Sequence, residues 1–542
     1  MYAGPLAISP DGRYVVFNAL RGGTLMLYSR ALDEANEREI PGTEGGTQAF
    51  FSPDGKWVGF FAQGQLKKVQ LAGGAVVPLG AVSGAHGATW AKGDVIVIGV
   101  LGGGGLLLVP ATGGTPKPVV RVDTATGELS QRWPLALEDG ETVLYQSWRG
   151  SFGSSQIGVA SISRGTTRLL DLPGGAFPIA VLEGKLIYVS AAGTLMAVSF
   201  DARRARITGA STPVGDEVSI NGLGCATAAI SLSGSLVYQS GKATSQLVLA
   251  DLQGRARTVV PEAKIYSFPR FSPDGKRIAV GVTTSTSTDI WIYDVASGTA
   301  TRLTSEGNND RPEWTPDGKR VLYYANSHRN QKRGELWWQP ADASGNAEIL
   351  QAHVTSGANE GVFSPDGHIL AYRLNGGGAV EDLWYRRLDG DTMPKVIAAS
   401  SFYESAPRFS PDGRWVAYES DQSGAKQVYV QPFPALGARY PVTAAGGETP
   451  IWSRDGRHIF YVANEQINVA TITTAPSFAV TSRQLLFEGT YAFGRYVHAM
   501  FDLAPDGQHL LLIKPTTSTA QTIVVHDWKF VLRQRTALAA KK

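Results

Sequence analysis

One short motif recurs along the whole chain and constrains the fold more than any other feature. An apolar or aromatic residue is followed by Ser-Pro-Asp-Gly or a close variant, one or two polar residues and an apolar strand. Weaker copies near residues 93, 139, 184 and 234 fill the one long gap between clear copies, which gives twelve anchors about 45 residues apart. The clear copies place their Asp-Gly pairs at Asp11-Gly12, Asp54-Gly55, Asp274-Gly275, Asp317-Gly318, Asp366-Gly367, Asp412-Gly413, Asp455-Gly456 and Asp506-Gly507.

Each repeat contains four predicted strands. The strand after the turn is apolar on both faces, as in Val321-Leu322-Tyr323-Tyr324, which is typical of a strand covered on both sides. A third strand, a polar or Gly-Gly turn and a fourth strand complete the unit. A repeat of this length with four strands predicts the blade of a β-propeller, so we expect an all-β fold of about twelve four-stranded blades.

The aspartates and glycines of the motif are predicted to be structural. Proline presets the backbone of a tight turn, Asp accepts hydrogen bonds from nearby N–H groups, and Gly tolerates positive φ. Calcium sites are the alternative, but they would need several acidic residues in each loop, and most of these loops have one.

Charge and composition exclude several classes of partner. The net charge is +3 and the basic residues are scattered, so the sequence predicts neither a nucleic-acid partner nor a membrane surface. No signal peptide is recognisable, and the uncharged stretch 95–116 is interrupted by Gly102–Gly105, which favours two short strands over a membrane span. The single cysteine, Cys225, is expected to be a small buried residue.

The second half of the chain resembles the TolB-type repeat family, some of whose relatives are described as WD-like. The residues that carry the resemblance are Arg302-Leu303-Thr304, Arg311 to Gly318 and Val321 to Tyr324. TolB-type propellers have six blades, so the resemblance implies two consecutive six-bladed propellers. We expect the first over residues 1–262 and the second over 263–535, followed by a short tail at 536–542.

The order of units also resembles the carboxy-terminal part of bacterial transmembrane serine/threonine protein kinases. Pro41 to Gly45, Phe50 to Phe61, Leu66 to Gly74 and Gln131 to Pro134 carry this resemblance. In those kinases a kinase domain and one membrane span precede a propeller region outside the membrane, and this chain contains neither. It is then a fragment, a chain with a misassigned start or a free-standing relative. The resemblance implies an extracytoplasmic or periplasmic location, and the absence of targeting signals leaves a cytoplasmic one open.

No catalytic motif is recognisable in the sequence. The glycine loop, lysine and aspartates of kinases, a P-loop, a Gly-x-Ser-x-Gly elbow and a His-Glu-x-x-His motif are all missing, so we expect no catalytic residues, cofactor or metal. Function is then expected at surfaces, through loops that converge at the top face and central channel of a propeller. The candidate contacts precede the turn motifs and are Tyr266, Arg311, Glu313, Tyr403, Glu404, Arg408 and Arg495.

Three functional hypotheses follow. The first is a non-catalytic module for a protein or peptide ligand, the sensor or scaffold part of a serine/threonine-kinase-like system. The second is a propeller enzyme whose active site is assembled from blade loops. The third is a periplasmic interaction protein like TolB.

Overall fold

Nearly all the regular secondary structure in the described part of the protein is β-strand. The computed structural model describes residues 6–21, 24–101, 104–149, 152–221, 224–241, 244–284, 287–326, 334–351, 358–375, 381–475, 477–493, 498–516 and 521–539. These residues form strands β1 to β47, one turn of 3-10 helix at Thr124–Thr126 and one α-helix, α1 (Trp528–Ala539). The predicted all-β class is confirmed.

The chain divides into two compact units, which are described separately. Unit 1 comprises Met1–Ala243 and Ser518–Lys542, and unit 2 comprises Thr244–Thr517. Each hydrophobic core cluster lies within one unit, and many clusters form where the strands of consecutive groups pack together, as Phe50 and Phe61 do with Trp90 and Ile96. The strand after each turn is buried on both sides; in β26, for example, Ile278 to Val282 are all buried.

Unit 1 contains consecutive antiparallel groups of strands. Two of the groups join into one larger sheet through a single pair, Val100 with Gln131. The groups are β1 (Ala7–Ile8), β2 (Tyr14–Arg21), β3 (Thr24–Ala31) and β4 (Arg38–Glu39); β5 (Thr47–Phe51), β6 (Trp57–Ala62), β7 (Gln65–Gln70) and β8 (Val77–Ala81); β9 (Ala85–Ala91), β10 (Val95–Val100), β11 (Leu106–Pro110) and β12 (Lys117–Val120); β13 (Ser130–Ala136), β14 (Thr142–Trp148), β15 (Gln156–Ser161) and β16 (Thr166–Leu169); β17 (Phe177–Leu182), β18 (Lys185–Val189), β19 (Thr194–Asp201), β20 (Arg206–Ile207) and β21 (Thr212–Glu217); and β22 (Ala228–Ile230), β23 (Leu236–Gln239) and β47 (Thr522–Val525).

Unit 2 is built in the same way. Its groups are β45 (Phe501–Leu503), β46 (His509–Pro515), β24 (Ser245–Asp251) and the first half of β25 (Ala256–Phe271); the second half of β25, β26 (Arg277–Thr283), β27 (Thr288–Asp294) and β28 (Ala300–Arg302); β29 (Asn308–Trp314), β30 (Arg320–Asn326), β31 (Glu335–Pro340) and β32 (Glu348–Gln351); β33 (Ala358–Phe363), β34 (Ile369–Asn375), β35 (Glu381–Arg387) and β36 (Lys395–Ala398); β37 (Glu404–Phe409), β38 (Trp415–Ser420), β39 (Gln427–Pro432) and β40 (Tyr440–Pro441); and β41 (Glu448–Trp452), β42 (His458–Ala463), β43 (Gln466–Thr473) and β44 (Ala479–Phe487).

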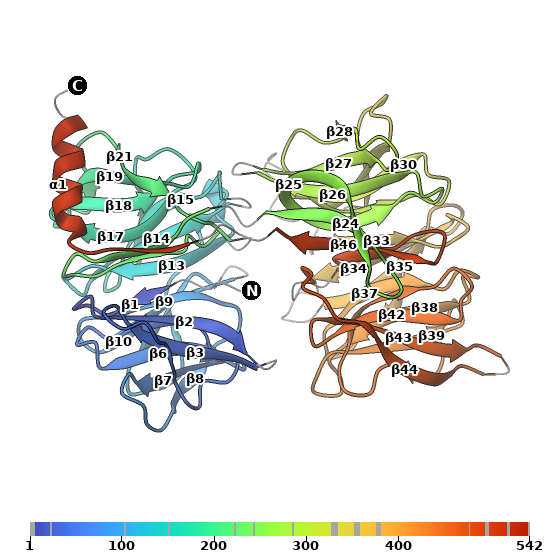
Figure 1. The fold of residues 1–542 in the computed structure, drawn as a ribbon, viewed down its shortest axis with the longest axis horizontal. Coiled ribbons are helices and arrows are strands. Elements are labelled where there is room, and N and C mark those ends of the chain that lie inside the picture. The colour runs from blue at the N-terminus through green and yellow to red at the C-terminus, as the bar shows by residue number, and fades with distance from the viewer. Residues whose placement is uncertain are drawn as a thin grey trace. The chain divides into compact units, whose positions relative to one another are not determined.

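Strands from distant parts of the sequence complete one group in each unit. In unit 1 the late strand β47 pairs with β23, and helix α1 follows it along the same unit (Figure 1). In unit 2 the first strand, β24, pairs with β46 from the end of the unit (Figure 1). Thr516 N–H donates to the carbonyl of Thr244, so the two ends of unit 2 are held together.

This pairing moves the division between the units away from the expected boundary at residue 262. That residue lies inside β25, whose first half pairs with β24 and whose second half pairs with β26. The observed division at Ala243 and Thr244 differs because β24 belongs with β46. The segment 518–535 lies in unit 1 rather than at the end of the second unit, and α1 continues to Ala539, into the expected tail.

The repeated turns have one hydrogen-bonding pattern, seen clearly at residues 272–277. The Ser272 hydroxyl donates to Asp274 Oδ1 at 2.6 Å, and that oxygen also accepts from Lys276 N–H at 3.1 Å. The Ser272 hydrogen bond leads the causes that lower the pKa of Asp274. Gly275 has φ +72°, where a side chain is strained. Equivalent hydroxyl–carboxylate bonds occur at Asp11, Asp54, Asp317, Asp366, Asp412 and Asp455.

Candidate functional site

Four charged residues of unit 2 occupy one position in the repeat, two residues before the Ser, Thr or Ala that begins the turn. They are Arg270 on β25, Glu313 on β29, Arg408 on β37 and Asp502 on β45. All four lie on the first strand of a group. We call these four residues, together with Arg311, Asn359, Glu360, Arg373, Ser405, Glu419, Thr449 and His498 of the same unit, the polar cluster.

A β-bulge lies just before this position in most of these first strands. Phe268, Arg311, Ala406 and Thr449 have φ between 52° and 55°, and a proline follows each of them. The strand register shifts at each of these places. Positive φ is uncommon outside glycine and bulges redirect side chains, so the bulge accounts for the different directions of Arg311 and Glu313 on one strand.

Glu313 is shared by two arginines. Arg270 Nε lies 3.2 Å and Arg408 Nη1 3.3 Å from the same atom, Glu313 Oε2. The side chain of Arg270 is 3% exposed, whereas Arg408 and Glu313 are 14% and 20% exposed. The ion pairs therefore extend from the interior of unit 2 to groups that solvent reaches.

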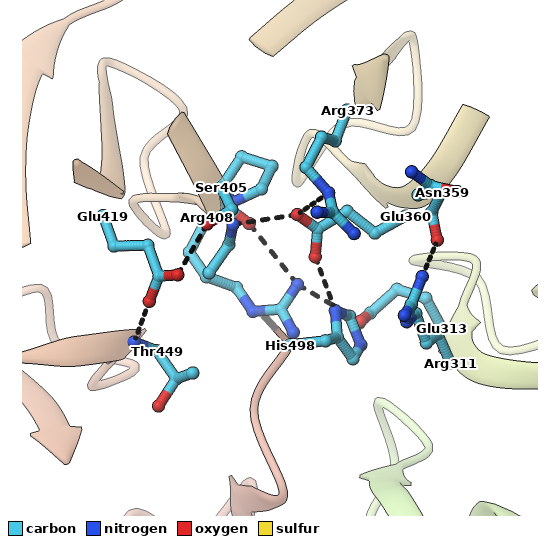
Figure 2. Close-up of polar contacts among 12 residues, drawn as sticks. Arg311, Glu313, Asn359, Glu360, Arg373, Ser405, Arg408, Glu419, Thr449 and His498 are labelled. Carbon is cyan, nitrogen blue, oxygen red and sulfur yellow. Dashed lines mark hydrogen bonds and ion pairs between the residues drawn. The ribbon is translucent and has the colours of Figure 1, made fainter. Parts of the chain in front are cut away.

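A second, fully buried set of ion pairs centres on Glu360. Its Oε1 lies 3.2 Å from Arg373 Nε and accepts from Ala406 N–H at 2.9 Å, and its Oε2 lies 2.9 Å from His498 Nδ1. Figure 2 shows Glu360 between Arg373 and His498. Arg373 also pairs with Glu381, and it donates to the Tyr403 hydroxyl at 3.1 Å. Segments more than 100 residues apart in the sequence thus share one carboxylate.

Further hydrogen bonds join neighbouring strand groups around these ion pairs. Arg311 Nη1 donates to the carbonyl of Asn359 at 2.8 Å. Glu419 accepts from the Ser405 hydroxyl and from Thr449 N–H (Figure 2). The polar cluster therefore draws on the first strand of every strand group in unit 2.

Burial and charge together perturb the titration of the cluster. Burial, followed by the charges of Arg270, Arg408, Arg311 and Arg373, lowers the pKa of His498 well below its usual value. The imidazole is therefore neutral near pH 7. Because its Nδ1 faces a carboxylate, Nδ1 carries the proton and Nε2 presents its lone pair, for which the described residues supply no partner.

The pKa of Asp502 is shifted in the opposite direction to that of His498. Burial raises the pKa of its carboxyl to about 6, against the opposing charge of Arg270 and a hydrogen bond from Phe271 N–H at 2.7 Å. Between pH 4 and 6 the folded state therefore binds a proton that the unfolded state does not. This contribution to stability is present at low pH and is lost as the pH rises through 6.

An Asp502→Asn variant is therefore expected to be more stable than the wild-type chain at pH 8, by about 1–3 kcal/mol in unit 2, and nearly equal to it at pH 4. Asn keeps an acceptor for Phe271 N–H. Denaturant unfolding at the two pH values measures the difference. Asp274→Asn is the control with the opposite sign, because the folded state lowers the pKa of Asp274. A stability loss at pH 8 for Asp502→Asn would contradict the assignment.

Unit 1 has an apolar counterpart to the polar cluster. Its first strands β1, β5, β9, β13, β17 and β22 line a cavity of about 330 Å³. Phe50, Trp90, Trp133 and Phe177 contribute aromatic surface to this cavity. The same repeat architecture thus encloses aromatic side chains in one unit and ionised side chains in the other.

The predicted contact residues lie in different environments. Arg311, Glu313 and Arg408 lie in the polar cluster, and Tyr403 touches it through Arg373. Tyr266 is buried against Tyr293, and Glu404 is buried beside Ser400, and neither belongs to the polar cluster. Arg495 lies outside the described residues.

Five residues of the polar cluster are not among the predicted contacts: Arg270, Glu360, Arg373, His498 and Asp502. A signal existed for Arg270 and Asp502, which share the repeat position of Glu313 and Arg408. Glu360, Arg373 and His498 occupy other positions, and no regularity of the sequence marks them.

The described residues contain no group of three or more His, Cys, Asp or Glu side chains placed to hold a metal ion. No helix among them is long and apolar enough to span a lipid bilayer. Cys225 is buried, as expected.

Residues 233–350 and 331–511, together more than half of the chain, match the TolB beta propeller domain (PD40). The chain belongs to the TolB β-propeller family. The matched region covers nearly all of unit 2 and, before it, strand β23 of unit 1. The polar cluster therefore lies within a TolB β-propeller domain, and the predicted TolB-like repeat is confirmed.

Relatives of the TolB β-propeller chain include two curated bacterial proteins. The uncharacterized peptidase YuxL of Bacillus subtilis is 25% identical over 30% of this chain and 31% of its own length. The uncharacterized protein Atu1656 of Agrobacterium fabrum is 29% identical over 27% of this chain and 52% of its own length. The chain thus spans about a third and about half of these relatives. The crystal structure of TolB from Acinetobacter baumannii aligns with a TM-score of 0.34 and 15% identity, over 68% of this chain and 77% of that one.

Proposed function

We propose that the chain is a non-catalytic binding module made of two six-bladed β-propellers. In unit 2 the strand groups follow one another, and β24 closes the series by pairing with β46. The turns support a closed ring, because in all of the unit 2 turns except that of Gly507 the glycine packs near the proline of a neighbouring turn. A Cβ atom added to Gly318 would lie 3.5 Å from Pro273, and one added to Gly275 would lie 3.4 Å from Pro505 in the last turn.

The polar cluster is the observation that carries the binding role. Removing charges from water costs several kcal/mol for each ion, and a buried ion pair is often less stabilising than apolar residues of the same size. In unit 1 four of the first strands place aromatic residues around the cavity (Phe50, Trp90, Trp133 and Phe177), so the repeat does not require charge at every first strand. Partly exposed Arg311 and Arg408, the latter beside Glu313, are therefore best explained as contacts for a protein or peptide ligand.

The kinase resemblance supports a role for this module in a receptor-like system. As the sensor or interaction part of a bacterial serine/threonine-kinase-like protein, it would lie outside the cytoplasm and report a ligand to a kinase domain. The alternative is a periplasmic TolB-like interaction component. The reading frame upstream of Met1 separates the two, since a kinase domain and membrane span support the first and a secretory signal supports the second.

An enzyme with a loop-built site is the weaker candidate. Glu360 orients His498 as a carboxylate orients a general base, and one relative carries a peptidase name. However, the His498 side chain is only 1% exposed, and the Glu360 side chain is fully buried. A substrate that needs this imidazole as a base would have to displace the surrounding arginines.

Purified chain incubated with labelled ATP and magnesium is expected to incorporate no phosphate above a heat-denatured control. It is also expected not to cleave a mixture of internally quenched peptides. In parallel, a displayed random peptide library selected on the chain should yield enriched sequences that no longer bind Arg408→Gln. Phosphate incorporation, peptide cleavage, or enriched peptides that bind Arg408→Gln equally well would each contradict the proposal.

A further inference from the structure

The pairing of charges around Glu313 is incomplete. Two guanidinium groups, of Arg270 and Arg408, approach one oxygen of a single carboxylate. Guanidinium groups usually pair with carboxylates through two parallel hydrogen bonds, and neither arginine has this arrangement with Glu313. Among the described residues, the next carboxyl group near Arg270 is Asp502, which accepts a hydrogen bond from Phe271 N–H.

Arg270 and Arg408 each have hydrogen-bond donors that no described group accepts. Arg270 is 3% exposed, and its Nη2 is buried without any hydrogen-bond partner among the described residues. Arg408 Nη1 contacts Glu313 and the carbonyl of Pro407, whereas its Nε and Nη2 bond to none of the described groups. A buried donor without a partner costs free energy that a ligand acceptor would recover.

We propose that the polar cluster of unit 2 binds a carboxylate group of the ligand, which pairs with Arg270 and Arg408 beside Glu313. This inference rests on the proposed binding function and names the chemistry that the site recognises. The carboxylate is a peptide C-terminus, an Asp or Glu side chain, or a small free acid.

A single negative charge suits the site better than a doubly charged phosphate. Glu313, Glu360 and Asp502 already place acidic groups next to the arginines, and each would repel a second ligand charge. Arg408, at 14% the more exposed of the two arginines that pair with Glu313, presents a planar donor pair, which matches a carboxylate.

Two opposite substitutions test the proposal on the full chain. Arg408→Gln removes a donor pair and should weaken carboxylate binding about tenfold or more. Glu313→Gln removes the competing carboxylate and should tighten binding about threefold to tenfold. If the site instead captured a ligand cation through Glu313, Glu313→Gln would abolish binding. That result would overturn the proposal.

The probe is an array of random heptapeptides in three forms. One form has a free C-terminal carboxylate and no Asp or Glu, the second is amidated with one Asp or Glu, and the third is amidated without either. Acetate, succinate and inorganic phosphate serve as soluble competitors. We expect the first or second form to bind in preference to the third, and a carboxylate to compete better than phosphate.

The matched control is Arg414→Gln, which removes the same charge from the turn after β37, where Arg414 is 76% exposed and pairs with Asp412. It should bind as the wild-type chain does. Thermal unfolding of all variants checks that unit 2 is folded. Equal binding of all three peptide forms, with loss in Arg408→Gln, overturns the carboxylate proposal and keeps the binding module. Failure of every form to bind contradicts both.

Discussion

An Arg373→Met variant is expected to lose about 3–5 kcal/mol of the free energy of unfolding of unit 2. Arg373 is 2% exposed and pairs with Glu360, which is fully buried, and with Glu381. Removing the guanidinium leaves a carboxylate inside the protein without its main counter-charge. Hydrogen exchange, followed peptide by peptide, should show faster exchange in β33 and β34 and little change in β17 and β18 of unit 1.

Two further variants separate this effect from general damage. Arg387→Met removes an arginine that is 47% exposed and pairs with an exposed Asp389, and it should cost less than about 1 kcal/mol. Adding Glu360→Gln to Arg373→Met should recover part of the loss, because the buried charge is gone as well. A loss below about 1 kcal/mol for Arg373→Met would show that water reaches the cluster freely.

A Trp528→Ala variant is expected to destabilise unit 1 by about 3–5 kcal/mol and to leave unit 2 unchanged. Trp528 is 2% exposed and packs with Leu532 into a core formed by β17, β18 and β23. The backbone N–H of Trp528 donates to the carbonyl of Gly234 at 2.8 Å. The C-terminal segment is thus part of the unit that contains the first strands of the chain.

Phe530→Ala is the control from the same helix, because Phe530 is 55% exposed. It should change the stability of unit 1 by less than about 0.5 kcal/mol. Denaturant unfolding combined with hydrogen exchange of β22 and β23 measures both variants. Faster exchange in unit 2 than in unit 1 for Trp528→Ala would contradict the assignment of α1 to unit 1.

The repeat made the all-β class predictable. Each Pro-Asp-Gly turn reverses the direction of the chain, and the strand after it is apolar on both faces. The local sequence preferences therefore favour the same fold that the whole chain adopts. The division at Ala243 was not predictable in this way. A repeat shows where strands occur, but it does not show which distant strands pair, and β24 with β46 and β23 with β47 are such pairs.

The polar cluster was predictable only in part. Arg311, Glu313 and Arg408 precede turn motifs, so their convergence follows from the repeat. Tyr266 and Glu404 have similar places in the sequence, yet each is buried in its own strand group. A β-bulge of one residue determines which side chains of a first strand face the neighbouring strand groups. The only sequence feature that accompanies the bulge is the proline after Phe268, Arg311, Ala406 and Thr449.

Hydrogen exchange of the full chain, with and without a peptide enriched from the displayed library, tests the binding account most directly. The account predicts slower exchange at residues 268–271, 310–314 and 404–409, which carry Arg270, Glu313 and Arg408, and no such change in Arg408→Gln. Protection confined to unit 1 or to the outer strands β28, β32, β36, β40 and β44 would contradict it, because the ligand would then bind away from the polar cluster.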